Sequence, residues 1–322
     1  MLHLSALAYC GDRWSENRRW LREHKDAVEA PSVASVTWDR RITYRLFDCW
    51  VRLFRKDGWD DLDRVREIIA GLREDQRRFE QQSLENESSN ETRVKAYRLV
   101  ALYHWARATE LLALYMLQGE PNNVSTELDQ QFERSRDAAI KSQDMPFETL
   151  VRWLHVASRL MVQNSIWWVS HTVNARSTQF VKYVTKSRSL FELLPPQRDA
   201  LRKQGLLDIS SRAVIVDLPT SGGKTVLAQF RILQALNQFD ALQGWVAYVA
   251  PTRALTSQIT RRLRADFEGI NVHVEQLTGA IEIDTFEEAM LAAPNAANSF
   301  HVLVATPEKL DLVIRNRKVT RP

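Results

Sequence analysis

The sequence has only two cysteines, Cys10 and Cys49, among its 322 residues. Two thiols cannot form a disulfide framework or, by themselves, a metal site, and so low a content is typical of a reducing compartment. We therefore expect a cytoplasmic protein in which both thiols lie in the core.

Long hydrophobic runs are also missing. The most apolar helical stretch, residues 94–118, carries Arg107 and Glu110 in its middle, and the apolar start of the chain has no basic residues ahead of it. Both features argue against a membrane partner and a signal peptide. No segment repeats with a fixed period, so a solenoid is not expected. The net charge of +4 and the pI near 9.1 are compatible with nucleic-acid binding but do not indicate it.

Proline is scarce in the first half, where only three residues of this type precede Pro195, and nine of the ten tryptophans lie before residue 170. Apolar residues recur there at helical spacing. The two clearest stripes are Leu46, Phe47, Trp50, Val51 and Phe54, and Leu150, Trp153, Leu154, Ala157 and Met161. We predict an all-α accessory domain over residues 1–172, with about six helices.

Helix ends are indicated in the same region. A capping box at Ser88 and a capping aspartate, Asp144, predict helix starts, and Gly119 with the following Glu-Pro predicts a stop. The tryptophans are interpreted as core residues rather than base-stacking platforms. Likewise, His104 and His155 have no ligand-spaced partner and are interpreted as core or boundary residues rather than metal ligands.

Residues 173–188 are polar and basic, and we expect them to be a linker to a second domain over residues 189–322. In that domain short apolar runs alternate with helical stretches, which predicts a mostly parallel sheet covered by helices. The expected strands are residues 213–217, 245–250, 271–277 and 300–305.

The first expected strand leads into a loop that contains Gly-Gly-Lys-Thr, and a helical stretch follows it. A strand, a glycine-rich turn and a helix N-terminus favour phosphate binding, because main-chain N–H groups and the helix dipole converge there. We expect this loop to bind a nucleoside triphosphate, with Lys224 reaching the β and γ phosphates and the Thr225 hydroxyl binding Mg²⁺. Leu218 stands where the common pattern has glycine. The predicted loop residues are Pro219, Thr220, Ser221, Gly222, Gly223, Lys224 and Thr225.

Other polar groups surround this loop in the sequence. Upstream, Gln197 follows two prolines, and its amide offers the donor and the acceptor that the adenine edge requires. Downstream, each expected strand is followed by hydroxyl or basic side chains, which suit contacts with phosphodiesters. The side chains of this kind are Thr252, Arg253, Thr306 and Lys309, and the same segments contain Pro251 and Gly279, which complete six downstream candidates.

In this order, the segments resemble the motifs of superfamily 2 helicases, and the Ski-like DExH branch is the nearest. The resemblance covers roughly residues 189–318 and implies a RecA-like P-loop lobe that follows the helical domain. It implies adenine reading by Gln197, triphosphate binding by residues 222–225, and nucleic-acid backbone contacts by the six downstream candidates. In that branch the first glycine of the loop is commonly replaced, so Leu218 is a mild departure.

Such helicases also need a carboxylate pair, Asp-Glu-x-His or Asp-Glu-x-Asp, which holds Mg²⁺ through water and orients the attacking water. No Asp-Glu dipeptide occurs in this sequence. We therefore expect a partial first lobe in the amino-terminal portion of a longer helicase, from a truncated reading frame or a split protein. The missing portion would act in cis or in trans. This portion would bind ATP weakly and hydrolyse none alone.

Two other interpretations remain open. The chain could be a non-catalytic helical interaction module with a vestigial or regulatory nucleotide loop. It could also be another P-loop enzyme such as a nucleotide kinase, although this would not account for the residues that follow the later strands. The sequence does not distinguish DNA from RNA as the bound strand.

Overall fold

The structure is a computed structural model that describes residues 1–24, 38–83, 89–170, 174–211, 213–219, 222–238, 245–277 and 300–315. The chain divides into two compact units. The first, here called the helical unit, comprises Met1–Trp168 and Thr185–Glu192, and the second, the sheet unit, comprises Val169–Val184 and Leu193–Pro322.

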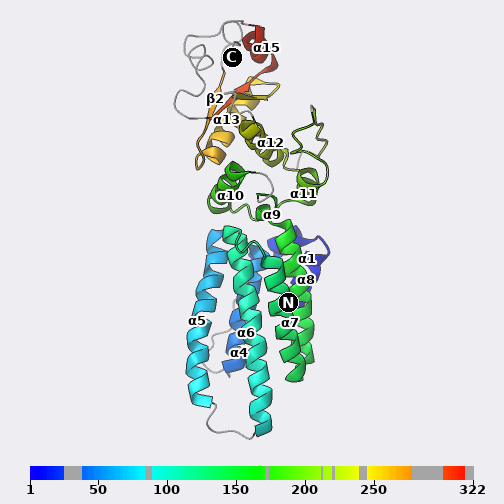
Figure 1. Ribbon diagram of the computed structural model, residues 1–322, viewed down its shortest axis with the longest axis vertical. Coiled ribbons are helices and arrows are strands. Elements are labelled where there is room, and N and C mark those ends of the chain that lie inside the picture. Colours follow the sequence, from blue (N-terminus) through cyan, green and yellow to red (C-terminus); the bar gives the residue numbers. More distant parts are fainter. Residues whose placement is uncertain are drawn as a thin grey trace. The chain divides into compact units, whose positions relative to one another are not determined.

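The helical unit is built from long helices that run side by side (Figure 1). Helix α6 contacts α4, α5, α7 and α8, and its apolar residues are spread around its circumference, which suits this central position. The helices are α1 (Leu2–Cys10), α2 (Trp14–Glu23), α4 (Trp38–Arg55), α5 (Trp59–Ser83), α6 (Ser89–Gln118), α7 (Val124–Lys141) and α8 (Met145–Asn164). Helix α9 (Ile166–Ser170) crosses the boundary between the units. Among the described residues, no helix is both long and apolar enough to cross a membrane.

Among the side chains that the structure describes, three tryptophans are buried as predicted. The indole N–H of Trp50 donates to Thr109 Oγ1 at 3.0 Å, and that of Trp167 donates to the Met116 carbonyl at 3.0 Å. Trp105 is also buried. The core interpretation is wrong for other tryptophans, because the exposed fractions of Trp20, Trp153 and Trp168 are 44%, 37% and 40%. Helical spacing alone did not distinguish the two groups.

The two histidines of this unit lie where they were expected, whereas only one of the two cysteines is in the core. His104 and His155 are half-buried and hydrogen-bonded, each at 2.7 Å, to the side chains of Gln131 and Asp129, as boundary histidines should be. Cys49 is buried, but Cys10 is only half-buried.

The indicated helix ends are present where the structure describes them. Asp144 caps α8 by accepting the Phe147 N–H at 3.1 Å. Helix α6 ends at Gln118, before Gly119, whose φ of 77° favours glycine. The capping box at Ser88 lies outside the described residues.

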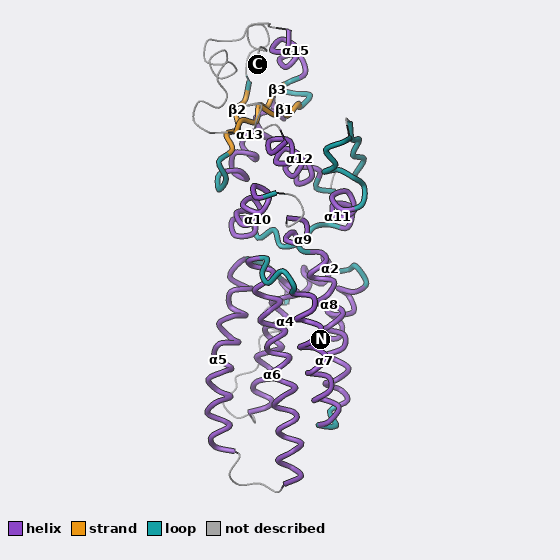
Figure 2. The backbone as a smooth tube through the Cα atoms, in the orientation of Figure 1, coloured by secondary structure: helices purple, strands orange, loops and turns teal. Residues whose placement is uncertain are grey.

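Within the described residues, the sheet unit contains three parallel strands in the order β1-β3-β2, seen side by side in Figure 2. Helix α13 packs against β2 and β3, whereas α12 and α15 contact β1. The elements are α11 (Pro195–Arg202), α12 (Lys224–Gln238), β1 (Trp245–Val249), α13 (Arg253–Phe267), β2 (Val272–Gln276), β3 (Phe300–Ala305) and α15 (Pro307–Arg315). Together with the helical unit, they confirm the predicted fold class, an α/β RecA-like P-loop lobe preceded by an all-α domain.

Residues 213–217 were expected to form the strand before the phosphate loop, and this prediction is wrong for the structure. The segment is assigned to no strand, and Ile215 is 95% exposed. Strand formation requires a neighbour that accepts the ladder hydrogen bonds, and β-branched residues alone do not provide one. The segment therefore leads to the phosphate loop without pairing with a strand of the described sheet.

Residues 173–188 were expected to be a linker, but helix α10 (Ala175–Arg188) occupies most of this range. Its polar composition concealed an apolar stripe at Phe180, Val181 and Val184, all of which are buried. Phe180 packs edge-on against Phe230 and Phe267 in the sheet unit. The exact boundaries of the functional domains stay a prediction.

Candidate nucleotide and nucleic-acid site

The phosphate loop meets its helix at two glycines. Gly223 has a φ of 69°, in the left-handed region that favours glycine, and helix α12 begins at the next residue, Lys224. The Gly222 N–H donates to the Pro219 carbonyl at 2.9 Å. The predicted helix start is therefore present. Thr220 and Ser221 lie outside the described residues.

Gln197 contacts this loop directly. Its side-chain oxygen accepts the Leu194 N–H at 2.9 Å, and its Nε2 donates to the Gly223 carbonyl at 3.1 Å. The glutamine is 4% exposed. The structure thus brings the predicted adenine reader against the phosphate loop, across 26 residues of sequence. The two groups that would pair with adenine are both engaged within the protein, so adenine would have to replace these partners.

Lys224 and Thr225 open helix α12. Lys224 is exposed and Thr225 is half-buried. Their place in the first turn of α12 puts an ammonium group and a hydroxyl where the helix dipole is positive, a setting that suits phosphate and its bound cation. The described residues contain no cluster of three histidine, cysteine or acidic side chains that could hold a metal by itself.

The ends of the strands form a second group. Val249 pairs with Ala305, the Ala250 N–H donates to the Ala305 carbonyl at 3.0 Å, and the Leu277 N–H donates to the Val304 carbonyl at 2.9 Å. All three strands are parallel, so their carboxyl ends lie at one edge of the sheet. The segments that follow them are thus brought together as predicted.

Two helix N-termini begin at this edge, each with a threonine cap. Thr252 Oγ1 accepts the Leu255 N–H at 3.2 Å at the start of α13, and Thr306 Oγ1 accepts the Lys309 N–H at 3.4 Å at the start of α15. The N-terminal turns of helices favour anions such as phosphate. Glu308 already places a carboxylate in the first turn of α15, and its own main-chain N–H together with Thr306 lowers its pKa.

The remaining nucleic-acid candidates differ in accessibility. Pro251, Thr252 and Arg253 are exposed, and Thr306 is half-buried. Lys309 is 1% exposed, so its burial does not support the backbone contact predicted for it. Its position one turn into α15 directs it inward, a property that the motif did not reveal. Gly279 lies outside the described residues, two positions after Leu277.

Comparisons with known proteins match the part of the chain that carries these residues. Residues 195–321 match the DEAD/DEAH box helicase family. The ATP-dependent DNA helicase Hel308 of Pyrococcus abyssi is 29% identical over 136 residues, 42% of this chain and 17% of that protein. The Hachiman protein HamB of Bacillus cereus is 25% identical over 171 residues, 52% of this chain and 14% of that protein.

A yeast helicase also matches part of this chain. The RQC trigger complex helicase SLH1 of Saccharomyces cerevisiae is 31% identical over 113 residues, 32% of this chain and 5% of that protein. The chain spans less than a fifth of the length of each of these relatives. The matches confirm the resemblance to superfamily 2 helicases for the sheet unit.

Proposed function

We propose that this chain is the ATP-binding amino-terminal portion of an ATP-dependent nucleic-acid helicase or translocase. The observation that carries the proposal is the contact of Gln197 Nε2 with the Gly223 carbonyl, at a left-handed glycine that opens helix α12. The contact joins a glutamine and a glycine-rich loop that the resemblance assigns to adenine and triphosphate. The match of residues 195–321 to a helicase family supports the same assignment.

In this proposal, the phosphate loop from Pro219 to Thr225 binds the triphosphate, and Thr225 contributes an oxygen to Mg²⁺. The ion supplies charge neutralisation between phosphate oxygens when it is bound. Lys224 pairs with the β and γ phosphates, because its ammonium group is exposed at the helix start. On nucleotide binding, Gln197 would replace its hydrogen bonds with the Leu194 N–H and the Gly223 carbonyl by hydrogen bonds with the adenine edge. The exchange would free the Gly223 carbonyl and couple adenine recognition to the loop.

Nucleic acid would bind at the carboxyl edge of the sheet. Thr252 and Thr306 cap two helices there, and Arg253 supplies an exposed positive charge. Hydroxyls, helix N-termini and a guanidinium all recognise phosphate rather than base, so the contacts would be independent of sequence. Gly279 and Pro251 would shape the same path.

We also propose that the 322 residues alone do not hydrolyse ATP. Hydrolysis in this family needs acidic residues that bind Mg²⁺ through water and orient the nucleophile. The sequence contains no Asp-Glu dipeptide that could provide them. The remainder of a helicase, supplied in cis or in trans, would complete the catalytic site.

Titration with a fluorescent ATP analogue in the presence of Mg²⁺ tests the binding proposal. Wild type should give saturable binding, and Lys224→Ala should weaken it by at least about tenfold, because the phosphates lose a charged partner. The matched control is Lys203→Ala, at a lysine whose side chain is 76% exposed in the same unit, and it should change the affinity little. Equal affinities for all three proteins would instead favour the non-catalytic module with a vestigial loop.

A phosphate-release assay on the same proteins tests the proposal that the chain alone does not hydrolyse ATP. We expect no steady-state turnover from wild type. Turnover that is measurable in wild type and lost in Lys224→Ala would contradict the proposal that the chain is inactive alone, while leaving nucleotide binding in place.

A further inference from the structure

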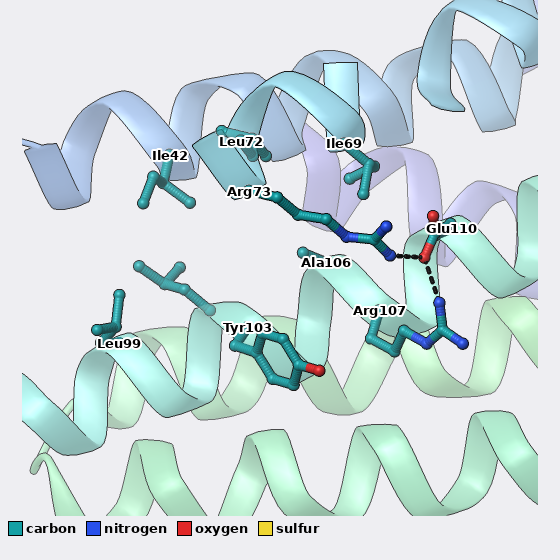
Figure 3. A pocket seen from close by; sticks show the side chains of 10 residues that line it. Ile42, Ile69, Leu72, Arg73, Leu99, Tyr103, Ala106, Arg107 and Glu110 are labelled. Atoms are coloured by element: carbon teal, nitrogen blue, oxygen red, sulfur yellow. Dashed lines mark hydrogen bonds and ion pairs between the residues drawn. The ribbon is translucent and has the colours of Figure 1, made fainter. Parts of the chain in front are cut away.

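A small apolar hollow lies between α4, α5 and α6 in the helical unit, far along the sequence from the phosphate loop. Its floor is formed by Ile42, Ile69, Leu72 and Leu102, all of which are less than 8% exposed. Figure 3 shows these helices contributing side chains that face one another across the opening. The cavity volume is about 30 Å³, which is room for part of one side chain and too little for a metabolite.

Two guanidinium groups and one carboxylate form the polar rim of this hollow. Glu110 Oε2 accepts from Arg73 Nη2 at 2.6 Å and from Arg107 Nη1 at 2.5 Å, as the dashed lines in Figure 3 mark. The side chains of Arg73 and Arg107 are 52% and 42% exposed. One carboxylate therefore faces two cations, which leaves the rim with an excess positive charge. Each guanidinium keeps further N–H donors after this contact.

The rim is continued along α6 by exposed apolar side chains. Tyr103 lines the opening and is 47% exposed, and Val100, one turn earlier, is 43% exposed. Tyrosine and arginine around a small apolar pocket form the composition that dominates the energetics of protein interfaces. We call the hollow with this rim the α4–α6 groove.

We propose that the α4–α6 groove docks an acidic amphipathic helix of a partner protein. One aliphatic side chain of that helix would enter the hollow, and a carboxylate about one turn away would pair with Arg73 and Arg107. The excess positive charge of the rim selects an acidic partner. The apolar floor and Glu110 disfavour nucleic acid. This inference is independent of the nucleotide site.

The probe is a fluorescently labelled synthetic helix of roughly 18 residues, about five turns, with leucine on one face and glutamate elsewhere. Its counterpart has lysine in place of every glutamate. Anisotropy titration of the full chain should give saturable binding of the glutamate peptide, weakened by added salt, and binding of the lysine peptide at least about tenfold weaker.

Two pairs of variants localise the binding. Arg107→Glu should weaken the glutamate peptide at least about fivefold, because it places a repelling charge in the rim. Arg64→Glu is the matched control: Arg64 makes the same i,i+3 contact with Glu67, also at 2.5 Å, but does not line the hollow. Tyr103→Ala should also weaken binding, whereas Trp153→Ala, at an exposed aromatic on α8, should not. All four sites are at least 37% exposed, so the variants should fold.

Three outcomes would overturn the proposal. They are equal binding of the two peptides, equal loss in Arg107→Glu and Arg64→Glu, and the absence of saturable binding of the glutamate peptide. A second copy of the chain is the competing occupant. If sedimentation shows a dimer that Arg107→Glu dissociates and Arg64→Glu does not, the groove is a self-association surface and the proposed acidic helical partner is wrong.

Discussion

Lys56 and Glu192 form an ion pair that is almost completely removed from solvent. Lys56 Nζ lies 3.0 Å from Glu192 Oε1, and the two side chains are 0% and 2% exposed. The same carboxylate accepts from Arg18 Nη2 at 2.7 Å and from the Tyr9 hydroxyl at 2.5 Å. Glu192 also pairs with Ser165 through the main chain. The buried carboxylate and the main-chain pairing of Glu192 therefore join segment 185–192 to the rest of the helical unit.

The first prediction is that Glu192→Gln strongly destabilises the helical unit. The change leaves the Lys56 ammonium buried without its counter-charge, and breaking a buried pair from one side costs about 3–5 kcal/mol. Urea unfolding followed by helical circular dichroism measures the effect. Glu67→Gln, in the exposed pair with Arg64, should cost less than about 1 kcal/mol.

The double variant Lys56→Met, Glu192→Leu checks the cause. Replacing both charges removes the buried ammonium and leaves only Arg18, whose side chain is 21% exposed, without the carboxylate, so the double variant should be more stable than Glu192→Gln. If it is as unstable as the single variant or less stable, packing rather than charge explains the loss.

The second prediction concerns pH. Burial lowers the pKa of Lys56 from 10.5 to about 8, although the charge of Glu192 acts in the opposite direction. The folded chain thus binds this proton less tightly than the unfolded chain. Between the two pKa values the unfolded chain holds more protons, so the free energy of unfolding rises with pH. Wild type should therefore gain stability relative to Lys56→Met from pH 8 to about 9.5.

Tyr9 acts in the opposite direction above that window, but Lys56→Met retains Tyr9, so the difference between the two proteins isolates Lys56. Burial raises the pKa of the Tyr9 hydroxyl well above 10.0, so the folded chain holds the Tyr9 proton more tightly, and stability falls at higher pH. Lys141→Met, at an exposed lysine of α7, is the control and should follow the wild-type pH curve. A constant difference between wild type and Lys56→Met across the window would show that Lys56 does not titrate there.

Local sequence signals predicted the elements whose burial follows a regular period. The stripes of α4 and α8 and the Asp144 cap follow from spacing and capping chemistry. The strands β1, β2 and β3 were indicated by apolar runs, and parallel pairing then placed the following residues at one edge. This edge was therefore predictable in outline.

Features that depend on distant partners were not predictable. Residues 213–217 have the composition of a strand but pair with no strand among the described residues. The contact of Gln197 with Gly223 joins residues with no periodic relationship, and so does the pair of Lys56 with Glu192. The burial of Lys309 depends on how α15 packs rather than on its motif. In each case the outcome depends on packing between residues that are far apart in the sequence, and local sequence patterns do not reveal such packing.

The third prediction is that Gly223→Ala impairs nucleotide binding. A Cβ at this position would lie 2.1 Å from Gln197 Nε2, and the φ of 69° disfavours any residue with a side chain. The loop and Gln197 must therefore separate, and we expect affinity for the fluorescent ATP analogue to fall at least about tenfold. Gly71→Ala, in α5 with nothing within 4 Å, should leave affinity unchanged and stabilise its helix by about 1 kcal/mol. Unchanged affinity in a folded Gly223→Ala would argue against the proposed site.

The fourth prediction is that Arg253→Ala weakens binding of single-stranded nucleic acid, because Arg253 is an exposed cation at the sheet edge where two helices begin. Arg261→Ala is the matched control, since Arg261 is also exposed on α13 but lies two turns further along the helix. Anisotropy with labelled oligonucleotides at several salt concentrations measures both. Loss of one phosphate contact should reduce the slope of log affinity against log salt by about 0.7 for Arg253→Ala. An equal reduction for Arg261→Ala would indicate a diffuse basic surface rather than a strand-binding edge.

Repeating the titration with DNA and RNA of the same sequence would also reveal which strand the edge prefers, because only RNA offers a 2′-hydroxyl.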